Sequence, residues 1–297
     1  MFILFTPFSF LFFSFYLMLI ACLFTIPNFY IFWIYIEIAM LVFIGLSYTI
    51  FLNRFSPLIV YFLIQAFASF RLLISYCWSS TLIFTIFIIF KLGIFPFHTW
   101  FLNAMYRFPN FILLLSATLQ KLPVFILIQV FNIYIERNIM WFGIIRSTVV
   151  AGILILITSD IRIIILSSSI GNNSWLMLSY FVNIQTFLIF FLTYSIFIAL
   201  IMSNIHYFSK PISLGLKTQS LFIFVVLIMS VSGLPPFPFF FAKIYVLAQY
   251  FYSFTDWSLL IIIFLISNSF MIAGYFKSVT KFYIHSYSSP SVFIHIL

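Results

Sequence analysis

Charged residues are scarce in this sequence. Only 6% of its 297 residues are charged, Asp and Glu together number four, and 65% of the residues are hydrophobic. A soluble domain carries about 25% charged residues, so this composition excludes a water-exposed globular protein. Apolar runs of about 20 residues recur along the chain, and each is long enough to cross about 30 Å of hydrocarbon as a helix. Because these runs do not alternate like the strands of a β-barrel, the predicted fold class is an all-α polytopic membrane protein.

Residues that bind metals, haem or nucleotides are also few. The two cysteines, Cys22 and Cys77, lie in separate apolar runs and form no CxxC motif. The four histidines are not paired as haem ligation requires, and the sequence has no GxGxxG or P-loop motif. The net charge is +9, but the basic residues are scattered singly, which is typical of topology signals rather than of a nucleic-acid surface. We therefore expect no cofactor or metal on this chain, a lipid bilayer around it, and no nucleic acid partner.

The apolar runs predict ten spans, at about residues 3–25, 29–51, 57–77, 81–101, 109–134, 139–159, 163–182, 185–204, 218–254 and 258–276. The first run lacks a basic n-region and a small-residue cleavage site, so we expect a retained span and not a signal peptide. The ninth run has two apolar halves, which fits either two spans or one broken helix. Ten spans keep Lys277 and Lys281 on the side that collects most of the basic residues, so the positive-inside rule favours ten. Both termini are then expected on this positive side.

Ten spans divide into two sets of five, at about residues 1–135 and 136–280, with a tail at 281–297. Because five is odd, the second set enters the membrane from the side opposite to the first. Inverted repeats of this kind are common in transporters. The sequence therefore predicts a single membrane domain built from two inverted five-helix repeats.

The fourth and ninth spans each combine a lysine with helix-breaking residues. Lys91 is followed by Gly93 and Pro96, and Lys243 is preceded by Gly233, Pro235 and Pro236. Proline removes a backbone donor and clashes with the preceding turn. Unwound backbone is tolerated at membrane depth where it lines a cavity, so a matched pair of interrupted spans indicates a transport site.

Four ionisable residues lie well inside the predicted spans: Glu37, Lys91, Lys121 and Lys243. Each costs about 2.5–3.5 kcal/mol at a helix centre. Lysines near helix ends can snorkel to the interface instead, and Glu37 can serve in a structural ion pair. Burial favours the neutral form of a lysine and a nearby carboxylate favours the charged form. Together these four residues predict proton translocation.

Polar residues beside these charges are candidates for relay or hydration. His98 follows the first break, and its unperturbed pKa suits a relay at neutral pH, although a structural histidine fits equally well. Ser168, Ser169 and Asn172 make the seventh span unusually polar. They fit a water chain and helix-to-helix hydrogen bonds equally well.

Several segments resemble the NADH dehydrogenase subunit 2 family of mitochondrial complex I. They occur in the family's order: "WIYIEIAMLVFI" with Glu37, "YFLIQAFAS", "KLGIFPFHTW" with Lys91, "ATLQKLP" with Lys121, "IRIIILSSSIGNNSW", and "SGLPPFPFFFAKIYVL" with Lys243. The resemblance implies an antiporter-like fold and assigns proton translocation to these four residues. The family usually has a histidine at the position of Asn172, so a relay here needs water or the nearby serines.

The resemblance also implies a place of action. It implies a proton-translocating membrane subunit of NADH:ubiquinone oxidoreductase in the mitochondrial inner membrane, with the matrix on the positive side. Other membrane-arm subunits are then its partners, and NADH, FMN, iron–sulfur clusters and ubiquinone bind elsewhere in the complex. A stand-alone cation/proton antiporter and a non-pumping membrane scaffold are the alternatives.

Overall fold

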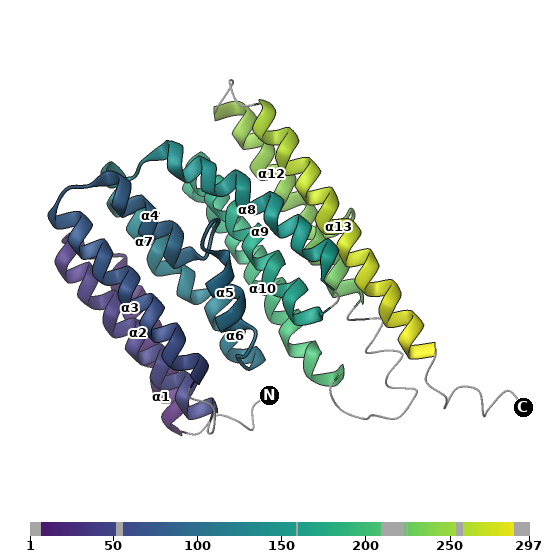
Figure 1. Ribbon diagram of the computed structural model, residues 1–297, viewed down its shortest axis with the longest axis horizontal. Coiled ribbons are helices and arrows are strands. Elements are labelled where there is room, and N and C mark those ends of the chain that lie inside the picture. The colour runs from purple at the N-terminus through teal and green to yellow at the C-terminus, as the bar shows by residue number, and fades with distance from the viewer. Residues whose placement is uncertain are drawn as a thin grey trace, which may run out of the picture. The chain divides into compact units, whose positions relative to one another are not determined.

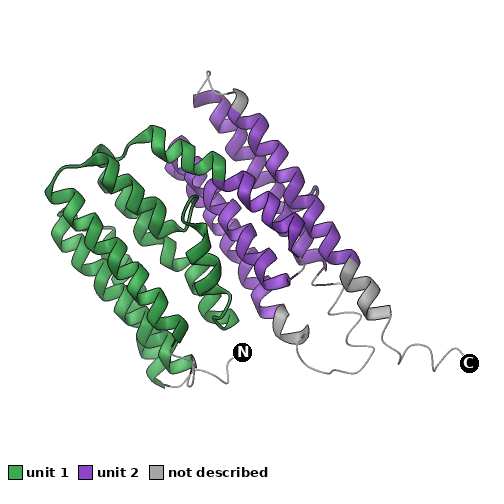
Figure 2. Ribbon diagram, in the orientation of Figure 1, with its two compact units in different colours: residues 1–146 green, residues 147–297 purple. Residues whose placement is uncertain are grey.

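The computed structural model describes residues 7–51, 56–158, 160–208, 223, 225–253 and 258–287. Within these ranges the chain forms helices joined by turns, and no strand occurs in them (Figure 1). Six helical segments in the described ranges are long and apolar enough to cross a membrane. The predicted class of an all-α polytopic membrane protein is therefore confirmed. The chain divides into two compact units, residues 1–146 and 147–297 (Figure 2).

The first unit begins with four helices: α1 (Pro7–Leu23), α2 (Phe29–Phe51), α3 (Ser56–Cys77) and α4 (Thr81–Leu92). Each packs against the next along the chain. Large apolar side chains occupy both their inner and their outer faces: Phe32 and Phe43 are fully buried, whereas more than half of Leu41 is exposed. A helix that is apolar all round belongs in a protein core or in a membrane, so the outer faces of these helices suit lipid.

The first predicted interruption is confirmed. Helix α4 ends at Leu92, and Gly93 takes a left-handed conformation with φ of 66°. The chain turns until α5 (His98–Met105) begins. Glycine adopts this conformation without the steric penalty that a side chain would add, and Pro96 has no N–H with which to continue α4.

The fifth span is present at Asn110–Val130, but it is interrupted at a place that the sequence analysis did not predict. The chain forms α6 (Asn110–Ala117), a 3₁₀ turn at Leu119–Lys121, and α7 (Leu122–Val130). The break lies at Thr118, whose φ and ψ are −118° and −82°. Pro123 gives the physical reason, because in a continuous helix its ring would clash with the carbonyl four residues earlier.

The second unit is built around one buried helix. Its described helices are the C-terminal part of α8 (Arg137–Ile157), α9 (Ile161–Val182), α10 (Ile184–Phe208), α12 (Pro238–Ser253) and α13 (Ser258–Tyr287). Helix α9 packs against α10, α12 and α13, and residues 164–179 of α9 are buried without exception. The polar residues of α9 therefore lie in the core of the unit.

The second predicted interruption is confirmed, and its backbone repeats the first. Helical residues 225–232 precede Gly233, which again has a positive φ, 78°. In the first break the N–H of Gly93 donates to the Phe90 carbonyl at 3.1 Å, and the N–H of Phe97 donates to the Ile94 carbonyl at 2.8 Å. In the second break the N–H of Gly233 donates to the Ser230 carbonyl at 3.2 Å, and the N–H of Phe237 donates to the Leu234 carbonyl at 3.0 Å. Donor and acceptor are three residues apart in all four hydrogen bonds. The pattern Gly-x-x-Pro-Phe, at residues 93–97 and 233–237, thus makes the same turn twice.

The last described helix is longer than predicted. Helix α13 runs to Tyr287, so its expected end near residue 276 is wrong. Lys277 was expected after the helix but lies inside it, and its Nζ donates to the Leu156 carbonyl at the end of α8 at 2.6 Å. A lysine side chain can donate to the last carbonyls of a helix in this way. The charge of Lys277 is therefore accommodated inside α13, and the residue does not have to lie in a loop. The predicted ten-span topology and repeat boundaries stay predictions.

Candidate functional site

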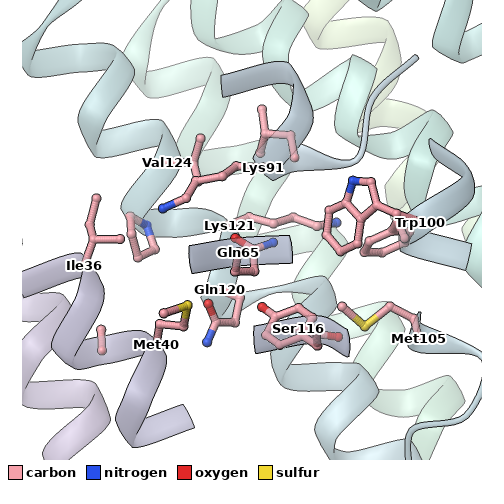
Figure 3. A pocket seen from close by; sticks show the side chains of 15 residues that line it. Ile36, Met40, Gln65, Lys91, Trp100, Met105, Ser116, Gln120, Lys121 and Val124 are labelled. Carbon is pink, nitrogen blue, oxygen red and sulfur yellow. The ribbon is translucent and has the colours of Figure 1, made fainter. Parts of the chain in front are cut away.

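The first unit encloses a cavity between α2, α3, α4, α5, α6 and α7. Its volume is about 30 Å³, which is enough for about two water molecules. Apolar side chains form most of the wall, and the polar lining residues are Tyr61, Gln65, Lys91, Trp100, Ser116, Gln120 and Lys121. Lys91 and Lys121, which are far apart in the sequence, therefore share one buried space (Figure 3).

Lys91 reaches this cavity from the last turn of α4. Only 8% of its surface is exposed. The end of a helix presents unpaired carbonyls and a partial negative charge, which stabilises a cation there. The break at Gly93 thus leaves Lys91 in the last turn of a helix that ends inside the protein.

Glu37 approaches Lys91 from α2. Its neighbours Ile36 and Met40 line the cavity, and its carboxylate interacts electrostatically with Lys91. Its Oε1 atom is buried and has no hydrogen-bond partner among the described residues. The Glu37 carboxylate thus lies within electrostatic range of Lys91, and its Oε1 keeps an acceptor available for water or for another donor.

Lys121 lies at the interruption that the sequence analysis missed. It ends the 3₁₀ turn between α6 and α7, and only 4% of its surface is exposed. Gln120, next to it, also lines the cavity, and its Nε2 is buried without a hydrogen-bond partner in the described part of the chain. The missed signal was Pro123 in "QKLP", two residues after the lysine.

His98 does not join this cavity. It begins α5, its ring stacks on Phe95 with the centroids 6.0 Å apart, and it is not among the lining residues. Its Nδ1 is buried and has no hydrogen-bond partner among the described residues. His98 thus lies outside the cavity that Lys91 and Lys121 line, against the ring of Phe95.

Lys243 lies in the second unit, on α12, and is 4% exposed. Its Nζ donates to the side-chain oxygen of Asn268 at 2.6 Å and to the Ser232 carbonyl at 3.2 Å. The rings of Trp175 and Phe239 lie 5.6 and 5.0 Å from the same Nζ, within cation–π range. The lysine thus folds back onto the break that precedes it.

Asn268 was missed by the sequence analysis, which considered uncharged polar residues only in the seventh span. The available signal was an amide in the apolar run "FLISNSF" of α13. Polar residues inside membrane helices are usually placed to bond across helices. Its partner lies 25 residues away in sequence, so the sequence alone did not connect the two.

The polar residues of α9 differ in their hydrogen bonding. The hydroxyls of Ser168 and Ser169 each donate to a carbonyl three residues earlier. Ser168 also approaches Tyr275 of α13, and Ser169 approaches Tyr194 of α10. The Oδ1 atom of Asn172 is buried with no hydrogen-bond partner in the described ranges. These contacts fit helix-to-helix bonding at the serines and leave an acceptor for water at Asn172.

The comparisons with known proteins agree on one family. A sequence pattern described as "NADH:quinone oxidoreductase/Mrp antiporter, TM" matches residues 78–272. The chain is 30% identical over 164 residues to NADH-ubiquinone oxidoreductase chain 2 of Gallus gallus, covering 53% of this chain and 47% of the relative. It is 27% identical over 233 residues to the protein of that name from Rhipicephalus sanguineus, covering 73% and 72%. The chain thus spans about half the length of the bird relatives that it matches.

Solved structures agree on the fold. A chain of respiratory complex I from Thermus thermophilus superimposes with a TM-score of 0.69 at 18% identity, over 83% of this chain and 64% of that one. A chain of the Mrp complex from Dietzia sp. superimposes with a TM-score of 0.70 at 14% identity, over 84% and 55%. Since the matched sequence pattern covers well over half of the residues, this chain belongs to the NADH:quinone oxidoreductase/Mrp antiporter transmembrane family.

Proposed function

We propose that this chain is a proton-translocating membrane subunit of NADH:ubiquinone oxidoreductase (complex I). Glu37, Lys91, Lys121 and Lys243 are its proton-carrying residues. The observation that carries the proposal is that Lys91 and Lys121 line one buried cavity, each at an interruption of its helix. Relatives named NADH-ubiquinone oxidoreductase chain 2 support the choice of complex.

The first step of the mechanism is a change in the charge of Lys91. An ionised Glu37 stabilises the ammonium form, while burial favours the neutral amine. When the carboxylate is protonated or turns to another partner, Lys91 releases a proton to water in the cavity. Because the two groups interact, their titration belongs to the pair.

The second step is transfer through the cavity. Lys121 faces the same space and accepts the proton by way of water held by Gln65 and Gln120. In the second unit Lys243 is the proton-carrying group, and Ser168, Ser169 and Asn172 of α9 are the polar residues proposed to hold water there.

The chain works within a larger assembly in this proposal. Its partners are other membrane-arm subunits, and NADH, FMN, iron–sulfur clusters and ubiquinone react in other subunits. The membrane is the mitochondrial inner membrane, with both termini on the matrix side. Two inverted five-helix repeats, at about residues 1–135 and 136–280, bring an interrupted fourth helix to each half.

A stand-alone cation/proton antiporter is the second candidate. The fold likeness to a chain of the Mrp complex favours it. The two candidates use the same buried lysines but differ in assembly, because only the first requires an NADH-oxidising complex.

The test combines assembly with pumping. The chain should migrate on a native gel with a large NADH-oxidising complex. In that complex, reconstituted into vesicles, Lys121→Met should lower the number of protons moved per NADH by this chain's share. Arg71→Met is the matched control, because Arg71 is exposed on α3 and lies over the Phe67 ring, and it should leave the ratio unchanged.

Two results would overturn the proposal. A small species without NADH oxidation supports the antiporter instead. An unchanged ratio in fully assembled Lys121→Met complex shows that the buried lysine is structural.

A further inference from the structure

The side chain of Lys243 is held by two oxygens from different segments. One is Oδ1 of Asn268 on α13, at 2.6 Å, and the other is the backbone carbonyl of Ser232, at 3.2 Å. Both acceptors are uncharged. Two of the three ammonium protons are therefore engaged, and one is not held by either oxygen.

The break itself makes the Ser232 carbonyl available. In a continuous helix this carbonyl would accept from the N–H of residue 236, but residue 236 is proline and has no N–H. Gly233 leaves the room that the lysine needs, because a Cβ at this position would lie 3.0 Å from Nζ of Lys243. The interruption thus provides both a partner and a space for the amine.

Asn268 supplies the second partner from outside the break. It lies in the long apolar helix α13, where a polar side chain usually forms a hydrogen bond to another helix. Its oxygen accepts from Lys243 whether the amine carries three protons or two, since a neutral amine still has two N–H donors. The contact therefore survives loss of the proton.

We propose that Asn268 is a positioning residue that fixes the Lys243 amine so that one defined proton exchanges. When the proton leaves, the N–H electron pair stays on Nζ, and the two remaining protons keep their bonds to Asn268 and Ser232. The exchanging proton is then the one directed away from both oxygens. This inference rests on the proposed proton-carrying role of Lys243.

Asparagine suits this task better than either of its isosteres. Aspartate would place an anion beside the ammonium group and hold it in the charged form. Leucine has the same shape but accepts no hydrogen bond, so the flexible lysine side chain would be free to turn. Neither variant would allow a repeated cycle of release and uptake at a fixed position.

The experiment compares four variants in the assembled, reconstituted complex: Asn268→Leu, Asn268→Asp, Asn268→Gln and the reference Lys243→Met. Protons moved per NADH and the amount of assembled complex are measured for each. Asn268→Leu and Asn268→Asp should lose as much of the ratio as Lys243→Met. Asn268→Gln keeps an amide and should retain more of the ratio than either. Ser269→Leu is the matched control, because Ser269 is the exposed neighbour on α13, and it should keep the full ratio.

The outcomes separate the two claims. If Lys243→Met keeps the full ratio, the proposed role of Lys243 fails, and this inference fails with it. If Lys243→Met lowers the ratio while assembled Asn268→Leu does not, the role of Lys243 stands and the positioning role of Asn268 is wrong. If Asn268→Leu reduces only the amount of complex and leaves the ratio unchanged, Asn268 is structural and the inference is also wrong.

Discussion

The two helix breaks have the same pattern of backbone hydrogen bonds, but the lysines beside them differ in position and surroundings. Lys91 comes two residues before its glycine, at the end of α4, whereas Lys243 comes ten residues after its glycine and folds back onto it. Lys91 lines a cavity together with Lys121 and lies within electrostatic range of the Glu37 carboxylate. Lys243 is held by a neutral amide and a carbonyl. The same Gly-x-x-Pro-Phe turn therefore supports one lysine that lies near other charged side chains and one lysine that is held by uncharged dipoles.

The largest effect should come from filling the first break. Gly93→Ala combines a φ of 66° with a Cβ placed 2.8 Å from Cβ of Phe101. A residue with a side chain costs about 1–2 kcal/mol in the left-handed conformation. In addition, Cβ of Phe101 cannot move away from the new methyl group unless the backbone moves with it. We expect a severe loss of assembled complex on native gels. Gly143→Ala is the control, because there the nearest atom is the flexible Cδ1 of Ile89, at 3.3 Å. Equal assembly of the two variants would show that the turn tolerates a side chain.

A smaller loss of assembly should follow the same change in the second break. Gly233→Ala has a similar φ, 78°, but the new Cβ meets the end of the Lys243 side chain, with Nζ at 3.0 Å. That end can move away, so the complex should assemble better than with Gly93→Ala. The displaced amine should then move fewer protons per NADH. Full pumping by this variant would contradict the view that the position of Lys243 matters.

The smallest of the three effects should come from the cavity wall. Gln120→Leu removes a buried amide that faces the cavity and makes the space less able to hold water. We expect intact assembly and a partial fall in protons per NADH, smaller than with Lys121→Met. The control is Gln185→Leu, at an exposed position on α10. If both glutamine variants pump normally, hydration of this cavity does not limit transfer.

Much of the fold could be predicted because bilayer helices have strong local signals. The breaks at 93–97 and 233–237 followed from Gly and Pro alone, and the four charges inside the spans stood out in apolar runs. The break at Thr118 was missed, since Pro123 sits inside an otherwise uniform run. The end of α13 was misplaced because the charge of Lys277 is satisfied by a carbonyl from another helix.

The site was harder to predict than the helices. Asn268 carries no charge, and its role depends on a partner that only the folded unit brings within 2.6 Å. The cavity that joins Lys91 and Lys121 arises from packing of several helices. Long-range packing of this kind has no local pattern in the sequence.

The central claim is that Glu37 and Lys91 act as one proton-carrying pair. The most direct test is the number of protons moved per NADH by assembled complex carrying Glu37→Gln, Lys91→Met or both. Both single variants should lower the ratio, and the double variant should be little worse than either, as expected for residues that act as a unit. An unchanged ratio at unchanged turnover in Glu37→Gln would contradict the account and make Glu37 a structural residue.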